Sequence, residues 1–194
     1  MFRGVYVNKN NIANGPPARQ GTYVGTVRSN GSAQIDWIVG AADTAGSLGV
    51  WNMYNRVLST AFVTDSTNTW EYTTATWRQA GGLATNQISA IIGLSEDAVD
   101  IRVLGLATNN TSTVFVAVGV GVNSTSVNSS PTFGGPAPSA YYGNGGANYV
   151  SRPGVGWYTF AWLEISAAGV GTTTWAGDAG GSLMQSGMTG SFWM

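Results

Sequence analysis

The chain divides into short runs of β-forming residues separated by turn signals, and this pattern restricts it to all-β folds. Gly, Asn, Asp and Pro recur between the runs at intervals of about 8–12 residues. No stretch has Leu, Ala, Glu and Lys at the spacing of a good helix. We therefore expect a β-sandwich or jelly roll with about nine or ten strands. The absence of a repeat of fixed period disfavours a propeller or a solenoid.

Composition indicates one domain with an unusual surface. A chain of 194 residues fits a single β-sandwich, and its 43% hydrophobic residues can form a substantial core. Charged residues make up only 9% of the chain, against a usual share of about 25%. The surface must therefore consist largely of Ser, Thr, Asn and the 28 glycines. Such a surface suits close packing against further copies or other partners.

Charge is distributed unevenly and indicates an extended N-terminal docking arm over residues 1–20, followed by the sandwich over 21–194. The first 20 residues hold three basic residues and no acid, whereas the remainder holds five Arg and nine acidic residues. An arm of this kind is typical of a segment that docks onto an acidic surface, although three scattered charges can also be without function. The residues proposed to dock are Phe2, Arg3, Tyr6, Lys9 and Arg19. Because no dense Lys/Arg cluster accompanies them, nucleic acid is not an expected partner.

The lack of His and Cys limits the chemistry available to this chain. The usual nucleophile–base pairs and most transition-metal sites need one of these residues. A glycosidase needs only two carboxylates facing each other across a cleft, and Glu71 and Glu164 lie beside aromatic residues on expected strands. The competing interpretation is that they pair with arginines such as Arg56 or Arg78, or that they face solvent. We favour this interpretation, and hence expect no enzyme, catalytic residue or cofactor.

A second group of acidic residues lies close together in the sequence. Glu96, Asp97 and Asp100 could contribute oxygen ligands to a calcium ion. Their spacing matches no calcium loop, however, so a solvated acidic turn over Ser95–Asp97 is the favoured interpretation, and no metal site is assigned.

Local signals predict several elements. Asn30-Gly31 between Thr22–Arg28 and Ala33–Gly40 predicts a β-hairpin, because both turn residues accept a positive φ. One long β segment is expected from Val50 to about Val63. Trp70 and Trp77 fall on opposite faces of a regular strand, which predicts a bulge or a break near Thr73–Ala75. The segment from Asn123 to Gly146 is expected to be the longest loop.

Aromatic residues permit two interpretations. Trp and Tyr can stack on sugar rings, and Tyr141, Tyr142 and Tyr149 on or near the long loop are the candidates for such a glycan platform. Core or subunit-interface packing is the favoured role for most aromatic residues, and for Trp51 and Trp77 in particular.

Targeting signals are not visible. Residues 1–20 contain no apolar segment of the secretory type, and no run of about 18 apolar residues occurs. We expect no membrane partner and synthesis in a cytoplasm.

Three motifs carry a resemblance to a known family: WNMYNRV (51–57), DSTNTWEYTTATWRQA (65–80) and GLSEDAV (93–99). With these motifs, the chain resembles virion proteins of tailed bacteriophages that occur as capsid decoration proteins, head fibres or fibre tips. The resemblance covers roughly Gly21 to Gly190 and carries no functional residues with it. It implies a non-enzymatic component of the virion, trimeric, and docked by its N-terminus.

A compact decoration or cement protein on the capsid exterior, bound to the major capsid protein, is the main expectation, because no collagen-like or coiled-coil stalk precedes the domain. Its arm would be mobile in the free protein and would become ordered on the capsid. The alternative is a receptor-binding tip that recognises host glycans, and a carboxylate-dependent glycan hydrolase is a distant third.

Overall fold

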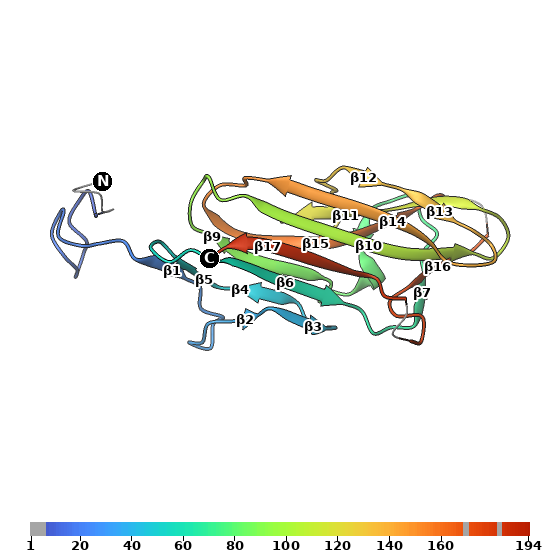
Figure 1. Cartoon of the computed structure of the whole chain (residues 1–194), viewed down its shortest axis with the longest axis horizontal. Helices are drawn as coiled ribbons and strands as arrows, with labels where there is room; N and C mark the ends of the chain where they lie inside the picture. Colours follow the sequence, from blue (N-terminus) through green and yellow to red (C-terminus); the bar gives the residue numbers. More distant parts are fainter. Residues whose placement is uncertain (1–6, 169–170, 182–183) are drawn as a thin grey trace.

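The computed structural model describes residues 7–168, 171–181 and 184–194, and it shows two facing β-sheets (Figure 1). The expected all-β fold is confirmed, and the two sheets form a sandwich. A single 3₁₀ turn, η1 (Ala80–Gly82), is the only helical element in this part of the chain. None of the described residues forms a helix of the length and apolarity that crossing a bilayer requires.

The first sheet has six strands in its main path and two more beside it. In spatial order the six are β12 (Thr132–Phe133), β14 (Gly143–Ser151), β10 (Val99–Asn109), β17 (Gly187–Trp193), β6 (Leu58–Thr64) and β3 (Gly40–Ala42). The end of β10 also pairs with β16 (Thr173–Ala176), which in turn pairs with β7 (Thr69–Glu71). All pairs in this sheet are antiparallel except β3 with β6.

The second sheet lies across the core from the first. Its order is β13 (Gly135–Ala137), β11 (Val114–Val122), β15 (Gly156–Ser166), β9 (Gln87–Ile92), β4 (Gly46–Leu48) and β2 (Trp37–Ile38), with β8 (Arg78–Gln79) also paired to β15. A separate two-stranded ribbon joins β1 (Gly25–Val27) to β5 (Val50–Asn52) at one end of the sandwich. The described residues thus form seventeen strands, more than the nine or ten expected, because many edge strands have only two to four residues.

Both lateral edges of the sandwich are crossed by the chain itself. At one edge β2 of the second sheet leads through Val39 into β3 of the first sheet. At the other edge β12 of the first sheet leads through Gly134 into β13 of the second. The expected long loop from Asn123 to Gly146 is therefore partly wrong, since it contains these two short strands and the start of β14.

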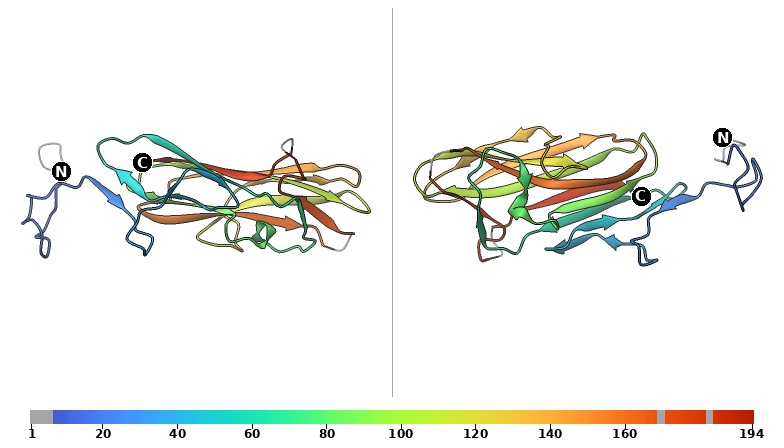
Figure 2. Two further views of the ribbon diagram at one scale, coloured as in Figure 1. Left: turned by 90° about the horizontal axis from the view of Figure 1, so that it is seen from below. Right: turned by 180° about the vertical axis from the view of Figure 1, so that it is seen from behind.

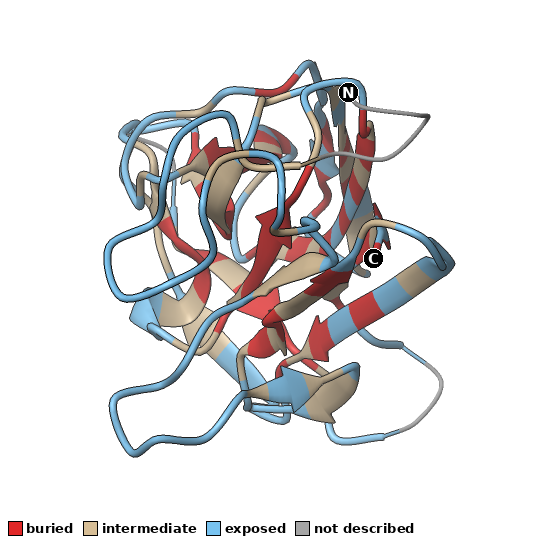
Figure 3. Ribbon diagram, turned by 90° about the vertical axis from the view of Figure 1, so that its left-hand side faces the viewer, coloured by how far each residue is buried: buried red, intermediate tan, exposed pale blue. Residues whose placement is uncertain are grey.

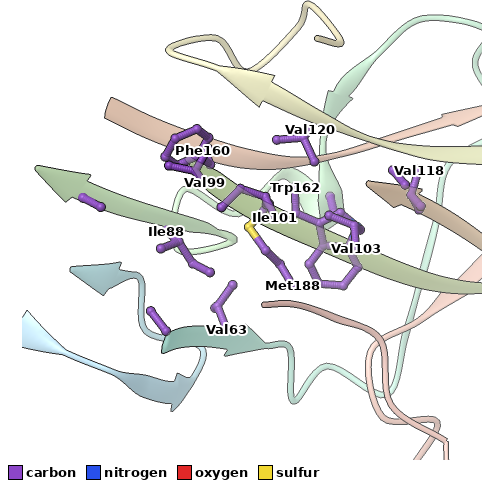
Figure 4. Packing of buried hydrophobic residues seen from close by; sticks show 14 of the residues in the cluster. Val63, Ile88, Val99, Ile101, Val103, Val118, Val120, Phe160, Trp162 and Met188 are labelled. Carbon is purple, nitrogen blue, oxygen red and sulfur yellow. The ribbon is translucent and has the colours of Figure 1, made fainter. Parts of the chain in front are cut away.

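The core lies between the sheets and follows the two-residue period of the strands. In β10, Val99, Ile101 and Val103 point inward, and Phe160 and Trp162 of β15 face them (Figure 4). Each fully buried aliphatic or aromatic side chain of this size contributes about 1.5–3 kcal/mol relative to an exposed one. Outward positions alternate with inward ones, and Figure 3 shows this as alternating buried and exposed bands along the strands.

The predicted hairpin at Asn30-Gly31 is wrong in its pairing. The turn itself forms, with the Asn30 amide donating to the Gln34 carbonyl at 2.8 Å. The two arms then separate because Gly49 lies between them. The Arg28 amide donates to the Gly49 carbonyl at 2.9 Å, and the Gly49 amide donates to the Asp36 carbonyl at 3.2 Å. β1 consequently pairs with β5, and β2 pairs with β4.

The expected β segment from Val50 to Val63 is interrupted after three residues. The Asn52 side-chain oxygen accepts hydrogen bonds from the Tyr54 and Asn55 amides at 2.9 and 3.2 Å, which turns the chain between β5 and β6. The break predicted near Thr73–Ala75 is confirmed, because β7 ends at Glu71 and β8 begins at Arg78. Across this break the chain passes from the first sheet to the second.

The described part of the N-terminal segment, residues 7–24, lies beyond the end of the sandwich where β1 and β5 pair (Figures 1 and 2). It folds back on itself, in contrast to the extended arm expected. The Asn8 side chain donates to the carbonyls of Asn10 and Pro17 at 2.8 Å and accepts from the Gly21 amide at 2.8 Å. Asn8 thereby closes a small loop that stands apart from the core.

Candidate functional site

A buried carboxylate joins two of the sequence motifs at the end of the sandwich near the N-terminal segment. Asp97 is almost fully buried, and its Oδ2 accepts a hydrogen bond from the Trp51 indole at 3.0 Å. Its other oxygen, Oδ1, accepts from the Arg56 guanidinium at 2.5 Å. The predicted solvated acidic turn is therefore wrong for Asp97, which pairs with an arginine and an indole inside the protein.

The close approach of the Trp51 indole explains why residue 93, the first of the GLSEDAV segment, is a glycine. Trp51 is buried against Gly93, and a Cβ at Gly93 would lie 1.9 Å from Trp51 Cδ2. No side chain can occupy that position without moving the indole. Trp51 is thus a core residue, as predicted, and it ties the WNMYNRV and GLSEDAV segments together.

A second buried carboxylate with the same kinds of partner lies in β15. Glu164 is fully buried, and its Oε2 accepts from the Trp70 indole at 2.8 Å. Its Oε1 accepts from Arg78 Nε at 2.7 Å and from the Gly81 amide at 3.3 Å, and Arg78 Nη2 also lies 2.7 Å away. Burial raises the pKa of Glu164, and the hydrogen bonds from Trp70 and Arg78 together with the Arg78 charge only partly oppose this.

Glu71 and Glu164, the hypothetical catalytic pair, do not face each other across a cleft. Glu71 is exposed on β7 of the first sheet, whereas Glu164 belongs to the second sheet. Both oxygens of Glu164 are engaged by groups of the protein. Glu164 therefore forms an ion pair with Arg78, as the non-catalytic interpretation of the sequence predicted.

The three acidic residues considered for calcium point to different partners. Asp97 pairs with Arg56, whereas Asp100 pairs with Arg102 at 2.8 Å on the outer face of the first sheet. Glu96 precedes Asp97 on the turn between β9 and β10, and it is exposed. Within the described residues no three His, Cys, Asp or Glu side chains form a group that could hold a metal ion.

An open cleft of about 630 Å³ lies directly over the Asp97 ion pair. Its aromatic walls are Tyr54, from the turn after β5, and Trp193, at the end of β17. Arg56, Glu96 and Arg152 supply charged groups at its rim. Sequence reasoning did not single out Tyr54, Arg152 or Trp193 as binding residues. The signal available for Tyr54 and Arg56 was their place in the WNMYNRV motif.

The predicted glycan platform of three tyrosines does not assemble. Tyr149 is partly buried, and its ring packs against core residue Phe160 with centroids 6.0 Å apart. Tyr141 is exposed before the start of β14, and Tyr142 follows it with intermediate exposure. β14 begins at Gly143, so about 20 Å of extended strand separates Tyr149 from the end of the strand beside Tyr142. These tyrosines therefore cannot contact one sugar ring together.

The predicted docking residues fall partly inside the described chain. Phe2, Arg3 and Tyr6 lie outside the described residues. Lys9 and Arg19 are exposed, and the Arg19 amide donates to the carbonyl of Asn8 at 2.9 Å. The closed loop thus brings the two cationic residues into neighbouring positions.

Apolar side chains are exposed on the outer face of the first sheet. Phe62 of β6 lies opposite Thr189 of β17, and Leu58 lies opposite Trp193. Leu104 of β10 and Val150 of β14 are exposed on the same face. The face also has a shallow depression of about 420 Å³ beside Phe62.

No family model and no curated protein matches this sequence.

Proposed function

We propose that this chain is a structural protein of a tailed-phage virion, a decoration or cement protein on the outer surface of the head. In this proposal it forms a homotrimer, binds the major capsid protein through its N-terminal segment and stabilises the shell. It is made in the host cytoplasm and acts without catalysis. The observation that carries the proposal is the separation between a closed sandwich and a small basic loop that projects from one end of it.

Strand order supports a jelly roll within the sandwich. β6, β17, β10 and β14 lie side by side in the first sheet, and β9, β15, β11 and β13 lie side by side in the second. Along the chain, these strands change sheet at every step except from β11 to β13. Two sheets of four strands with this alternation are the architecture of many capsid-associated proteins.

The outer face of the first sheet supports self-association. Soluble monomers rarely expose large contiguous apolar patches, and this face presents Leu58, Phe62, Leu104 and Val150 around small polar side chains. Few charges interrupt it, since Asp100 and Arg102 neutralise each other there. Packing of this face against further copies would remove the apolar side chains from water.

Attachment can be tested with particles that lack decoration. The full chain and a variant without residues 1–20 are incubated with undecorated shells, and bound protein is measured after sedimentation. We expect the truncated variant to remain a folded trimer and to lose attachment. A double variant, Lys9→Ala with Arg19→Ala, should also weaken attachment, whereas Arg152→Ala on the sandwich should not. Unchanged attachment of the truncated chain would place the docking surface on the sandwich and refute the proposal.

A receptor-binding fibre or tail tip is the second candidate, and the cleft beside Tyr54 and Trp193 favours it. Copy number separates the two. Hundreds of copies per particle, measured by mass spectrometry, would support decoration of the head, and a handful would support the tail.

A further inference from the structure

The cleft over Asp97 has two accessible aromatic rings, and hydrogen bonds fix the backbone that carries them. Tyr54 is 54% exposed and Trp193 is 42% exposed. The Asn52 side chain fixes the turn that carries Tyr54. Hydrogen bonds between Val57 and Met194, at 2.9 and 3.0 Å, fix the backbone beside Trp193. Aromatic side chains on a fixed backbone have only two rotatable bonds, so they lose little conformational entropy when a ligand packs on them.

The polar groups of the cleft offer both donors and an acceptor. Asp97 orients Arg56 through one carboxylate oxygen, and the Trp51 indole donates to the other oxygen of Asp97. The Arg56 guanidinium therefore keeps free N–H groups on the side of the cleft. Arg152 and Glu96 are exposed, and neither has an ion-pair partner among the described residues. The turn that carries Arg152 is fixed by a 2.6 Å hydrogen bond from the Tyr158 hydroxyl to the Pro153 carbonyl.

Charge balance in the cleft selects the class of ligand. Arg56 and Arg152 are offset by Glu96 and Asp97, so the lining carries no net charge. A polyanion would gain little from such a site. A pair of neighbouring hydroxyl groups fits it better, since each hydroxyl can donate to Glu96 and accept from Arg152. The apolar C–H face of a pyranose ring then has Trp193 or Tyr54 to pack against.

We propose that this cleft binds a neutral pyranose unit of a surface polysaccharide, with Trp193 and Tyr54 as the stacking residues and Glu96 and Arg152 as the hydroxyl-binding residues. The cleft volume of about 630 Å³ lies within the usual range of small-ligand sites. The proposal rests on the second candidate function for its biological meaning. It places glycan recognition at the end of the sandwich opposite the start of β14, where the tyrosines favoured by the sequence begin.

Binding can be measured on the purified full chain with defined polysaccharides. The neutral probes are dextran, mannan and galactan, and the acidic probes are polygalacturonate and polysialic acid. We expect saturable binding of at least one neutral probe by isothermal titration calorimetry, with a change in tryptophan fluorescence. Trp193→Ala and Tyr54→Ala should each weaken binding about tenfold or more, with little change in melting temperature.

Trp37→Ala is the matched control, because Trp37 is 44% exposed but lies on β2, outside the cleft. Its affinity for the neutral probe should equal that of the unmodified chain. The proposal is overturned if no neutral probe binds or if only acidic probes bind. It is also overturned if Trp193→Ala binds the neutral probe as tightly as the unmodified chain does. Attachment to undecorated shells is measured separately, so failure of the glycan proposal leaves the decoration proposal standing.

Discussion

Replacing Arg78 with methionine should leave the buried carboxylate of Glu164 without its cationic partner. Glu164 is fully buried, and Arg78 is its cationic partner at 2.7 Å. Removing one member of a buried ion pair typically costs about 3–5 kcal/mol. The Arg78 side chain is itself 34% exposed, so water can partly replace it. We therefore expect Arg78→Met to lower the free energy of unfolding by about 3 kcal/mol at pH 7, toward the lower limit of that range.

Arg102→Met provides a matched control for this variant. The Arg102–Asp100 pair has nearly the same length, 2.8 Å, but the Arg102 side chain is 69% exposed. Exposed pairs of this kind contribute about 0–1 kcal/mol. Urea unfolding followed by tryptophan fluorescence at constant ionic strength gives both values. A loss for Arg78→Met no larger than that for Arg102→Met would refute the assignment of a buried ion pair.

The pH dependence of folding stability tests the Arg78–Glu164 ion pair independently. Burial already raises the pKa of Glu164, and removing Arg78 takes away attraction and hydrogen bonding that oppose the increase. A carboxyl group with a raised pKa binds its proton more tightly in the folded state than in the unfolded state, so stability increases as the pH falls through the raised pKa. This gain is complete below the pKa of the unfolded chain, near the ordinary glutamate value of 4.5. The deficit of Arg78→Met relative to the unmodified chain should therefore shrink from neutrality toward that pH, and a deficit that grows would contradict the argument.

Three further predictions concern packing and association. Trp51→Ala should reduce the free energy of unfolding by about 3–5 kcal/mol, whereas Trp77→Ala should cost less because that side chain is only partly buried; thermal melts compare them. Gly93→Ala should destabilise the protein markedly through its clash with the Trp51 indole, whereas Gly181→Ala, with no atom of the described residues within 4 Å of the added Cβ, should leave the melting temperature unchanged. Phe62→Asp on the outer face of the first sheet should yield monomers by light scattering, and a stable monomer of the unmodified chain at micromolar concentration would exclude the proposed trimer.

Local patterns in the sequence predict the fold class and one chain break correctly. Alternating inward residues in β10 follow from the two-residue period of a strand, so this part of the sandwich core was foreseeable. The break between Trp70 and Trp77 was foreseeable for the same reason, since two tryptophans on opposite faces of one regular strand cannot both point into the core. Both predictions use only neighbouring residues, for which periodicity is a reliable signal.

Contacts between distant segments explain what the sequence could not predict. The Asn30-Gly31 turn forms, but Gly49 enters between its arms from almost twenty residues later and redirects both strands. Asp97 looks solvated beside Ser95 and Glu96, and only the approach of Trp51 and Arg56 reveals it as buried. Tyr149 looks like a loop tyrosine until its strand turns the ring toward Phe160. In each case the decisive partner lies far away along the chain.

The crossings at the two lateral edges bear on how this protein behaves when it is concentrated. An edge strand with a long row of unpaired amides and carbonyls is a template for strand addition and fibril growth. Here the outermost strands, β2, β3, β12 and β13, are only two or three residues long, and each edge is interrupted where the backbone passes to the opposite sheet. When copies of the protein are crowded together, the path of the chain at these edges therefore protects them from cross-β aggregation. Ordered assembly must then use contacts between side chains on the faces and ends of the sandwich.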